Sequence, residues 1–130
     1  MHMSRARFRW AAVLAGMAVL IQAAPAQADE PAGSYLLRVA PEHGPSTVRS
    51  LYCDPDGGTL DAASGACDQF RAANGEVGRI PAETGPCTMQ YAPVRVSARG
   101  SWHGSPRHFE QIFPNRCVAA RDTGGILFGE

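Results

Sequence analysis

The sequence is organised around one stretch, which reads Thr84-Gly85-Pro86-Cys87-Thr88-Met89-Gln90-Tyr91-Ala92-Pro93. Its two prolines fix φ at their own positions and bias the preceding residues toward extended backbone. Cys87 can tie the stretch to another part of the chain, and Met89 is left as an apolar side chain that is free to project. These features predict a restrained, extended loop that presents Met89 as bait. The simpler alternative is a disulfide-anchored loop that enters a strand.

The residues after this loop alternate between apolar and polar side chains, as strands with one buried face do. The alternation predicts a strand over residues 91–99 and a second strand over residues 108–113. Between them, residues 99–102 are expected to form a turn, and the second glycine in Trp102-His103-Gly104 is consistent with a bulge or tight connection. A turn or short helix is expected over residues 115–118. A short closing strand is expected over residues 124–128.

Two strands and a helix are predicted before the loop. Residues 34–40 and 47–53 are rich in aliphatic and aromatic residues, and a short turn containing proline and glycine joins them. This arrangement is typical of an antiparallel hairpin. The best helix candidate is residues 64–74, with Ser64 as a possible N-cap and Asn74-Gly75 as a stop signal.

Together these elements predict an α+β fold, in which short and mostly antiparallel strands pack against one clear helix, with room for a second, shorter one. Trp102 is expected to be a core or hairpin aromatic residue rather than a binding platform. His103 and His108 are expected at the surface beside a strand. The apolar positions of the predicted elements supply the core candidates, which are Leu36, Val39, Phe70, Val94, Val96, Phe109 and Phe113.

The first 28 residues have the organisation of a secretory signal peptide. A basic segment with three arginines precedes an apolar run over residues 11–21, and Ala26-Gln27-Ala28 is a small-residue cleavage site. The alternative is an uncleaved membrane anchor, but the apolar run is short for a membrane span. We therefore expect a secreted, extracellular protein whose mature chain, residues 29–130, is one domain with no membrane association after signal cleavage.

The charge balance of the chain excludes one class of partner. The whole chain has 12 basic and 12 acidic residues, and removal of the signal peptide would take away three arginines and leave a net charge of −3. Such a chain has no basic footprint for nucleic acid, so no nucleic-acid partner is expected. The sequence also lacks a Gly-x-Ser-x-Gly nucleophile motif and a cysteine expected to stay free, so neither enzyme activity nor a cofactor is predicted.

All four cysteines, Cys53, Cys67, Cys87 and Cys117, lie after the predicted signal peptide. An even number of cysteines in a secreted chain predicts two disulfides, and four cysteines allow three pairings. The simplest pairing joins neighbours in sequence, and the shorter of the two loops would then stabilise the fold by roughly 3 kcal/mol. A zinc site is the rival interpretation. Since the sequence has no Cys-x-x-Cys pair and no histidine at a convincing ligand spacing, no metal is expected.

A series of spaced motifs runs along the predicted mature chain. A first strand is followed by a cysteine that closes a strand and by a second cysteine at a helix start. The more specific motifs come later, and they are Cys87-x-Met89-x-Tyr91-x-Pro93, Trp102-x-Gly104 and Phe113-x-Asn115-x-Cys117. In type and spacing, these motifs resemble the Streptomyces subtilisin inhibitor-like family of secreted bacterial serine protease inhibitors.

The resemblance implies a fold that is more definite than the one read from periodicity. It implies a subtilisin inhibitor-like sandwich with a five-stranded antiparallel sheet, two helices packed on one face and two disulfides. The implied disulfides are Cys53–Cys67 and Cys87–Cys117. The resemblance also implies a homodimer packed through the sheets.

The resemblance implies a reactive site as well. Met89 would be the primary specificity residue, and Met89–Gln90 would be the bond that a subtilisin-like serine protease addresses. Asn115 would support the loop by hydrogen bonds to its backbone. The remaining residues of the implied binding loop are Pro86, Cys87, Thr88 and Tyr91.

The side chain of Met89 indicates which proteases are suitable targets. Methionine is unbranched and adaptable, so it suits the broad apolar pocket of subtilisin-like or chymotrypsin-like enzymes. A pocket with a buried carboxylate needs arginine or lysine instead. We therefore expect weak or absent inhibition of trypsin.

Three loop positions depart from the family pattern, because Thr88 stands where proline is common, Gln90 where valine is common and Ala92 where aspartate is common. Without a proline beside Met89, the loop is expected to be looser. The alternative function is a secreted structural or interaction protein on the same scaffold, for example a transglutaminase substrate that reacts through Gln90 or Gln111. With no lysine in the chain, it could serve only as the glutamine donor. An ordered loop with Met89 exposed favours the inhibitor, and a flexible loop favours the cross-linking substrate.

Overall fold

The computed structural model describes residues 12–22 and 30–129. Residues 12–22 form neither helix nor strand and are exposed, and the predicted basic segment and cleavage site lie outside the described residues. Within the described part, the helices are too short or too polar to cross a membrane. The signal peptide and the start of the mature domain therefore stay predictions.

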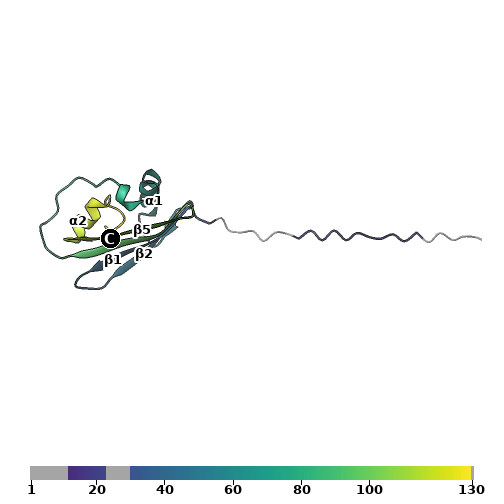
Figure 1. Ribbon diagram of the computed structural model, residues 1–130, viewed down its shortest axis with the longest axis horizontal. Coiled ribbons are helices and arrows are strands. Elements are labelled where there is room, and N and C mark those ends of the chain that lie inside the picture. Colours follow the sequence, from purple (N-terminus) through teal and green to yellow (C-terminus); the bar gives the residue numbers. More distant parts are fainter. Residues whose placement is uncertain (1–11, 23–29, 130) are drawn as a thin grey trace, which may run out of the picture.

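A five-stranded antiparallel sheet forms one layer of the domain, with the spatial order β3-β2-β1-β4-β5. The two helices lie over one face of this sheet and leave the other face open (Figure 1). The predicted α+β fold with five antiparallel strands and two helices is confirmed. The elements are β1 (Gly33–Pro41), β2 (Thr47–Cys53), β3 (Gly57–Gly58), α1 (Ala63–Ala72), a 3-10 helix (Val77–Arg79), β4 (Val94–Trp102), β5 (Ser105–Phe113) and α2 (Arg116–Asp122).

The core lies between the sheet and the two helices. Alternate residues of β1 and β4 are buried, which is the period of two expected when one face of a sheet is covered. At its centre, the ring of Tyr35 stacks on Phe70 of α1 with centroids 4.3 Å apart, and Phe70 in turn packs against Trp102 of β4. This stack joins α1 to the sheet, and it confirms the core position predicted for Trp102.

The hydroxyl of Tyr35 predicts a loss of stability at alkaline pH. It donates a 2.7 Å hydrogen bond to the carbonyl of Gly75. Burial raises the pKa of Tyr35 from 10.0 to about 12, an effect that Arg107 opposes and Glu76 reinforces. Because the folded-state pKa is the higher one, the protonated phenol stabilises the fold fully below pH 10, and this contribution is lost as the pH rises toward 12.

We expect the free energy of unfolding to fall by up to roughly 3 kcal/mol over that alkaline window. Urea denaturation at a series of pH values measures this fall. Tyr35→Phe should lower stability at neutral pH, because it loses the hydrogen bond to Gly75, but it should flatten the alkaline decline. An equally steep decline in Tyr35→Phe would show that another group causes it.

The turn between β4 and β5 does not lie over residues 99–102, as one prediction had it, but at Trp102-His103-Gly104, where a bulge or tight connection was also expected. The strand continues to Trp102, and the turn lies at His103-Gly104, where φ is 47° and 78°. Positive φ at both central residues is the mark of a type I′ turn, whose twist matches the flanking strands. Gly100 suggested a turn over residues 99–102, but it lies inside β4, where a Cβ atom would collide with the carbonyl of Ser34.

Three further predictions about elements are wrong. Residues 124–128 form turns and bends rather than a closing strand, and the fifth strand is the two-residue β3 beside β2. Helix α1 has Ala62 at its N-cap with no side-chain cap, so Ser64 lies inside the first turn instead of capping it. The segment over residues 91–93, predicted to begin a strand, still belongs to the loop before β4.

One of the seven core candidates is misplaced, and a second lies at the margin of the core. Leu36 is 57% exposed because it lies on the open face of the sheet, between residues of β1 that face the helices. Phe109 is only partly buried against the core. The other five candidates are buried, and His103 and His108 are exposed as predicted.

Candidate functional site

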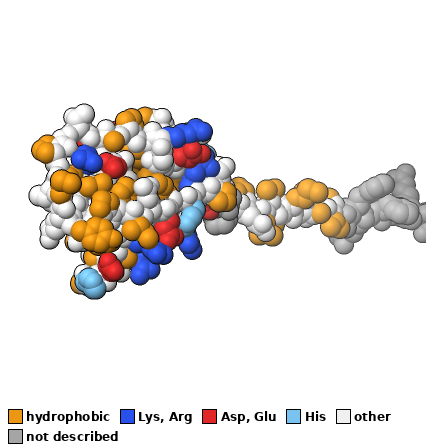
Figure 2. All heavy atoms as spheres, turned by 60° about the vertical axis from the view of Figure 1, so that its left-hand side comes forward, with side chains coloured by type: hydrophobic (Ala, Val, Ile, Leu, Met, Phe, Trp, Pro, Cys, Tyr) orange, Lys and Arg blue, Asp and Glu red, His pale blue; other side chains and the backbone are white. Residues whose placement is uncertain are grey.

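The stretch that organises the sequence lies in a long loop, residues 81–93, which contains neither helix nor strand. The loop projects at the end of the sheet where the β1–β2 turn also lies (Figure 1), and hydrophobic side chains are exposed on this end of the domain (Figure 2). Met89 is 100% exposed and Tyr91 is 80% exposed. Because Met89 contacts no core, it is not a gap-filling core residue, and it is free to enter a pocket of another protein.

A disulfide anchors the loop just before Met89. Cys87 is bonded to Cys117, which lies in the first turn of α2. The other disulfide joins Cys53, at the end of β2, to Cys67 of α1. These are the pairs that the family resemblance implies.

The two disulfides differ in their accessibility. Cys53 and Cys67 have no exposed surface, whereas Cys117 is exposed and Cys87 is half-buried. Since an attacking thiolate must reach a sulfur atom, we expect a mild thiol reductant to open Cys87–Cys117 first. Alkylation followed by peptide mass analysis identifies which pair has opened.

Opening this bridge should also destabilise the fold. A closed loop spanning 30 residues is expected to contribute roughly 3.5 kcal/mol in the chain-entropy model. A Cys87→Ser/Cys117→Ser double variant should reproduce the loss in urea denaturation. Earlier reduction of Cys53–Cys67 would contradict the order expected from burial.

Asn115 holds the loop on both sides of Met89. It is the N-cap of α2, and its Oδ1 accepts a hydrogen bond from the backbone N–H of Val118 at 2.9 Å. Its Nδ2 donates to the carbonyl of Thr88 at 3.0 Å and to the carbonyl of Gln90 at 2.8 Å. With 7% of its surface exposed, Asn115 is buried beneath the loop.

Backbone contacts hold the exit of the loop. The N–H of Ala92 donates to the carbonyl of Pro114 at 2.8 Å, and the N–H of Glu42 donates to the carbonyl of Pro93 at 2.9 Å. The chain after Met89 is therefore attached both to the end of β5 and to the β1–β2 turn. Sequence reasoning missed these contacts, because a backbone carbonyl carries no residue-type signal.

The position of Thr88 bears on the looser loop expected without a proline. Thr88 and Gln90 are exposed, but Asn115 fixes both of their carbonyl groups. The loop beside Met89 is therefore held by hydrogen bonds to its backbone, although no proline stands at position 88.

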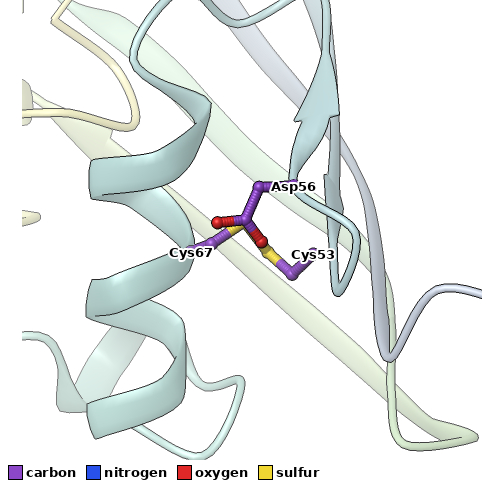
Figure 3. Close-up of side chains that lie close together, drawn as sticks. All are labelled: Cys53, Asp56 and Cys67. Atoms are coloured by element: carbon purple, nitrogen blue, oxygen red, sulfur yellow. A yellow bond between two sulfur atoms is a disulfide. The ribbon is translucent and has the colours of Figure 1, made fainter.

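One cluster away from the loop resembles a metal site. Cys53, Asp56 and Cys67 lie together between β2 and α1 (Figure 3), with their sulfur and carboxylate atoms within 4.8 Å of one another. Cysteine binds metals as a thiolate, but these two sulfur atoms are bonded to each other. The carboxylate of Asp56 pairs with Arg71 of α1. The internal bonds of the cluster therefore leave it unsuited to a metal ion.

Comparisons with known proteins agree with this architecture. The subtilisin inhibitor-like family matches residues 32–115, a range that contains the whole loop and Asn115. A candidate serine protease inhibitor of Streptomyces avermitilis is 36% identical over 122 residues, which cover 89% of this chain and 82% of that protein. Subtilisin inhibitor-like protein 3 of Streptomyces coelicolor is 40% identical over 85 residues, which cover 64% of this chain and 79% of that protein.

A solved structure of a protease inhibitor also resembles this chain. Sermetstatin of Streptomyces caespitosus, crystallised in complex with subtilisin of Bacillus licheniformis, superimposes with a TM-score of 0.55 at 28% identity. The match covers 70% of this chain and 91% of sermetstatin. The chain is therefore not an enzyme but a member of the subtilisin inhibitor-like family of protease inhibitors.

Proposed function

We propose that the protein is a secreted inhibitor of subtilisin-like serine endopeptidases, to which it presents the Met89–Gln90 bond. The observation that carries this proposal is a fully exposed Met89 between two carbonyl groups that Asn115 holds in place. The subtilisin complex of sermetstatin supports the class of partner. A titration of subtilisin activity tests the proposal. An inhibitor abolishes the activity at one molecule per enzyme, whereas a substrate lowers it only until the substrate has been cleaved.

Pre-organisation of the loop explains how such a protein can bind tightly. A protease binds an extended segment across its cleft, and an ordinary peptide must lose conformational entropy to take that shape. Here the disulfide at Cys87 and the two hydrogen bonds from Asn115 hold the segment before binding. The main chain around Met89 can then add to the substrate-binding edge of the enzyme as an extra strand.

The same restraints explain why cleavage would be slow and reversible. The protease serine attacks the carbonyl carbon of Met89, and the bond to the nitrogen of Gln90 breaks to give an acyl-enzyme and a new amino group. That amino group stays close, because Asn115 holds the carbonyl of Gln90 and Pro114 holds the N–H of Ala92. The amino group can attack the acyl-enzyme and reform the peptide bond, so resealing competes with release.

Met89 sets the specificity in this proposal. Its flexible, polarisable side chain suits a broad apolar pocket, so chymotrypsin-like enzymes are a second class of target. The order of the loop favours inhibition over a cross-linking role for Gln90. A transglutaminase needs its glutamine on a flexible segment, whereas the backbone of Gln90 is fixed by Asn115.

We further infer that residues 1–28 are removed during secretion and that the mature protein forms a homodimer through the open face of the sheet. Leu36, Val48 and Ile112 are exposed on this face, and such apolar surface favours association. The intact mass of the secreted chain tests the cleavage, with Asp29 expected at the new N-terminus.

Charge on the open face predicts how the dimer responds to salt. A groove of about 510 Å³ on this face is lined by Arg38, Arg95 and Arg99, with Glu110 as the one acidic residue beside them. Two copies packed face to face would bring like charges together, and salt screens such repulsion. We expect the dimer dissociation constant to fall several-fold between about 0.05 M and 0.5 M NaCl, as measured by sedimentation velocity.

A charge variant sharpens this test. Arg99→Glu should remove much of the repulsion, so its dimer should be tighter at low salt and less sensitive to salt. Leu36→Asp should break the dimer at every salt concentration. A wild-type dimer that weakens as salt is added would contradict this arrangement.

A further inference from the structure

The part of the loop that precedes Met89 has a support that the family motifs do not include. This entry arm, residues 81–87, runs past the C-terminal end of α2. Arg121, in the last turn of α2, contacts it twice. Its backbone carbonyl accepts the N–H of Glu83 at 2.8 Å, and its Nη1 donates to the carbonyl of Gly85 at 3.3 Å.

The guanidinium group of Arg121 is oriented by its neighbour. Its Nε donates to Oδ1 of Asp122 at 3.0 Å, while Nη1 points to Gly85. Arginine presents its donors in a rigid planar fork, so one group can make both bonds at once. Lysine, with a single ammonium group on a flexible stem, would not reproduce this geometry.

Gly85 is where the entry arm most needs support. Its φ of 143° lies in a region that other residues rarely adopt, and glycine loses more conformational freedom on ordering than any other residue. A charged donor on its carbonyl favours one conformation among the many that glycine could take. Without that donor, the ordering of Gly85 would rest on its neighbours, through the backbone bond of Glu83 on one side and Pro86 and the Cys87 disulfide on the other.

The end of α2 that carries Arg121 is itself fixed to the rest of the domain. Nε2 of Gln69, on α1, donates to the carbonyl of Gly124 at 2.8 Å, just beyond α2. Thr123 is buried, and its hydroxyl donates to the carbonyl of Ala119 at 2.7 Å. Arg121 therefore transmits to the entry arm the position of a helix that α1 holds in place.

We propose that Arg121, oriented by Asp122, is a positioning residue of the reactive loop, which it serves by holding the entry arm at Gly85. This proposal rests on the proposed function and deepens it. Helix α2 then supports the loop from both of its ends, through Asn115 and Cys117 at the start and Arg121 at the end. After cleavage, the arm that carries the new Met89 end stays in register with Gln90, which favours resealing over release.

The test compares Arg121→Gln with two graded variants and one matched control. Arg49→Gln is the control, because Arg49 is an arginine on β2, away from the loop and from α2, whose side chain donates to the neighbouring carbonyl of Val48. The rate at which Met89–Gln90 is cut in the subtilisin complex is measured by mass analysis, and the association rate and urea stability are measured alongside. Arg121→Gln should raise the cleavage rate about five- to tenfold and leave the association rate and stability nearly unchanged.

The graded variants separate positioning from general stability. Asp122→Asn keeps the arginine but weakens its orientation, so it should raise the cleavage rate about two- to threefold, and Arg121→Lys should fall between wild type and Arg121→Gln. Arg49→Gln should match wild type. A cleavage rate in Arg121→Gln equal to that of wild type would overturn the positioning role, while the proposed function would stand.

If the wild-type protein does not inhibit subtilisin, the proposed function fails. A second measurement then still tests the positioning role of Arg121. Hydrogen exchange of the free protein reports on the entry arm directly. Arg121→Gln should speed exchange in a peptide covering residues 81–88 several-fold, and Arg49→Gln should not. Unchanged exchange in Arg121→Gln would overturn the positioning role whether or not the protein inhibits.

Discussion

Met89→Arg is expected to lower the inhibition constant for trypsin by at least about a hundredfold, a change of roughly 3 kcal/mol. A specificity pocket with a buried carboxylate leaves that charge unpaired when methionine enters, whereas arginine satisfies it with charge-assisted hydrogen bonds. Because Met89 is fully exposed in the free protein, the substitution should leave the fold and the loop unchanged. Inhibition of subtilisin should weaken about tenfold or more, since an apolar pocket must desolvate the guanidinium group.

Two control variants show whether the effect belongs to position 89. Met89→Leu should keep subtilisin inhibition and gain nothing against trypsin. Tyr91→Arg places the same charge on another exposed position of the loop, and it should also gain nothing against trypsin. Trypsin inhibition gained by Tyr91→Arg but not by Met89→Arg, measured with a chromogenic substrate, would mean that Met89 is not the bait.

Asn115→Ala is expected to make the protein behave more like a substrate of the protease, with cleavage of Met89–Gln90 accelerated about thirty- to hundredfold. The variant loses two hydrogen bonds, to the carbonyl groups of Thr88 and Gln90, and each typically contributes about 1 kcal/mol net. The new amino group on Gln90 would then drift from the acyl-enzyme before the bond reforms. Mass analysis of the complex over time measures the cleavage rate.

Asn115 has two roles, as the N-cap of α2 and as a support of the loop, and their effects on cleavage must be distinguished. Asn115 also caps α2 through Val118, so Asn115→Ala should cost about 1 kcal/mol of stability for that reason alone. Asn115→Asp keeps an acceptor for the cap but offers no donor to the loop, so it should lose inhibition as Asn115→Ala does. Tyr35→Phe removes a buried hydrogen bond in the core, away from the loop and from α2. If it accelerated cleavage as strongly, the effect would come from lost stability.

The sequence predicted the elements whose signals are local. The strands over residues 34–40 and 47–53 match β1 and β2 closely, because each is a run of aliphatic and aromatic residues bounded by turn residues. The β4–β5 turn was assigned to Gly100, and Gly104 was given only a bulge or tight connection, because the two glycines carry the same turn signal. Only the packing of Gly100 against the backbone of β1 separates the two. The two-residue β3 has no periodicity at all, so its pairing with β2 could not be read from sequence.

In the candidate site, too, some residues could be predicted from the sequence and others could not. Met89 and Asn115 could be named from spaced motifs, since their roles depend on the type of their side chains. The contacts from Glu42 to Pro93 and from Arg121 to Gly85 could not, because the donor at Glu42 is a backbone N–H and Arg121 lies outside the spaced motifs. Which carbonyl groups lie within reach is decided by the tertiary fold, and any residue type could supply them.

The bond that the protease addresses is tested most directly by titrating subtilisin with the purified, oxidised mature chain and then identifying any nicked product by mass. The account predicts complete inhibition at one reactive loop per enzyme, with slow cleavage at Met89–Gln90 and at no other bond. Rapid cleavage with no lasting inhibition, or a first cut at another bond, would contradict it. The first of these results would make the interaction-protein alternative the leading one.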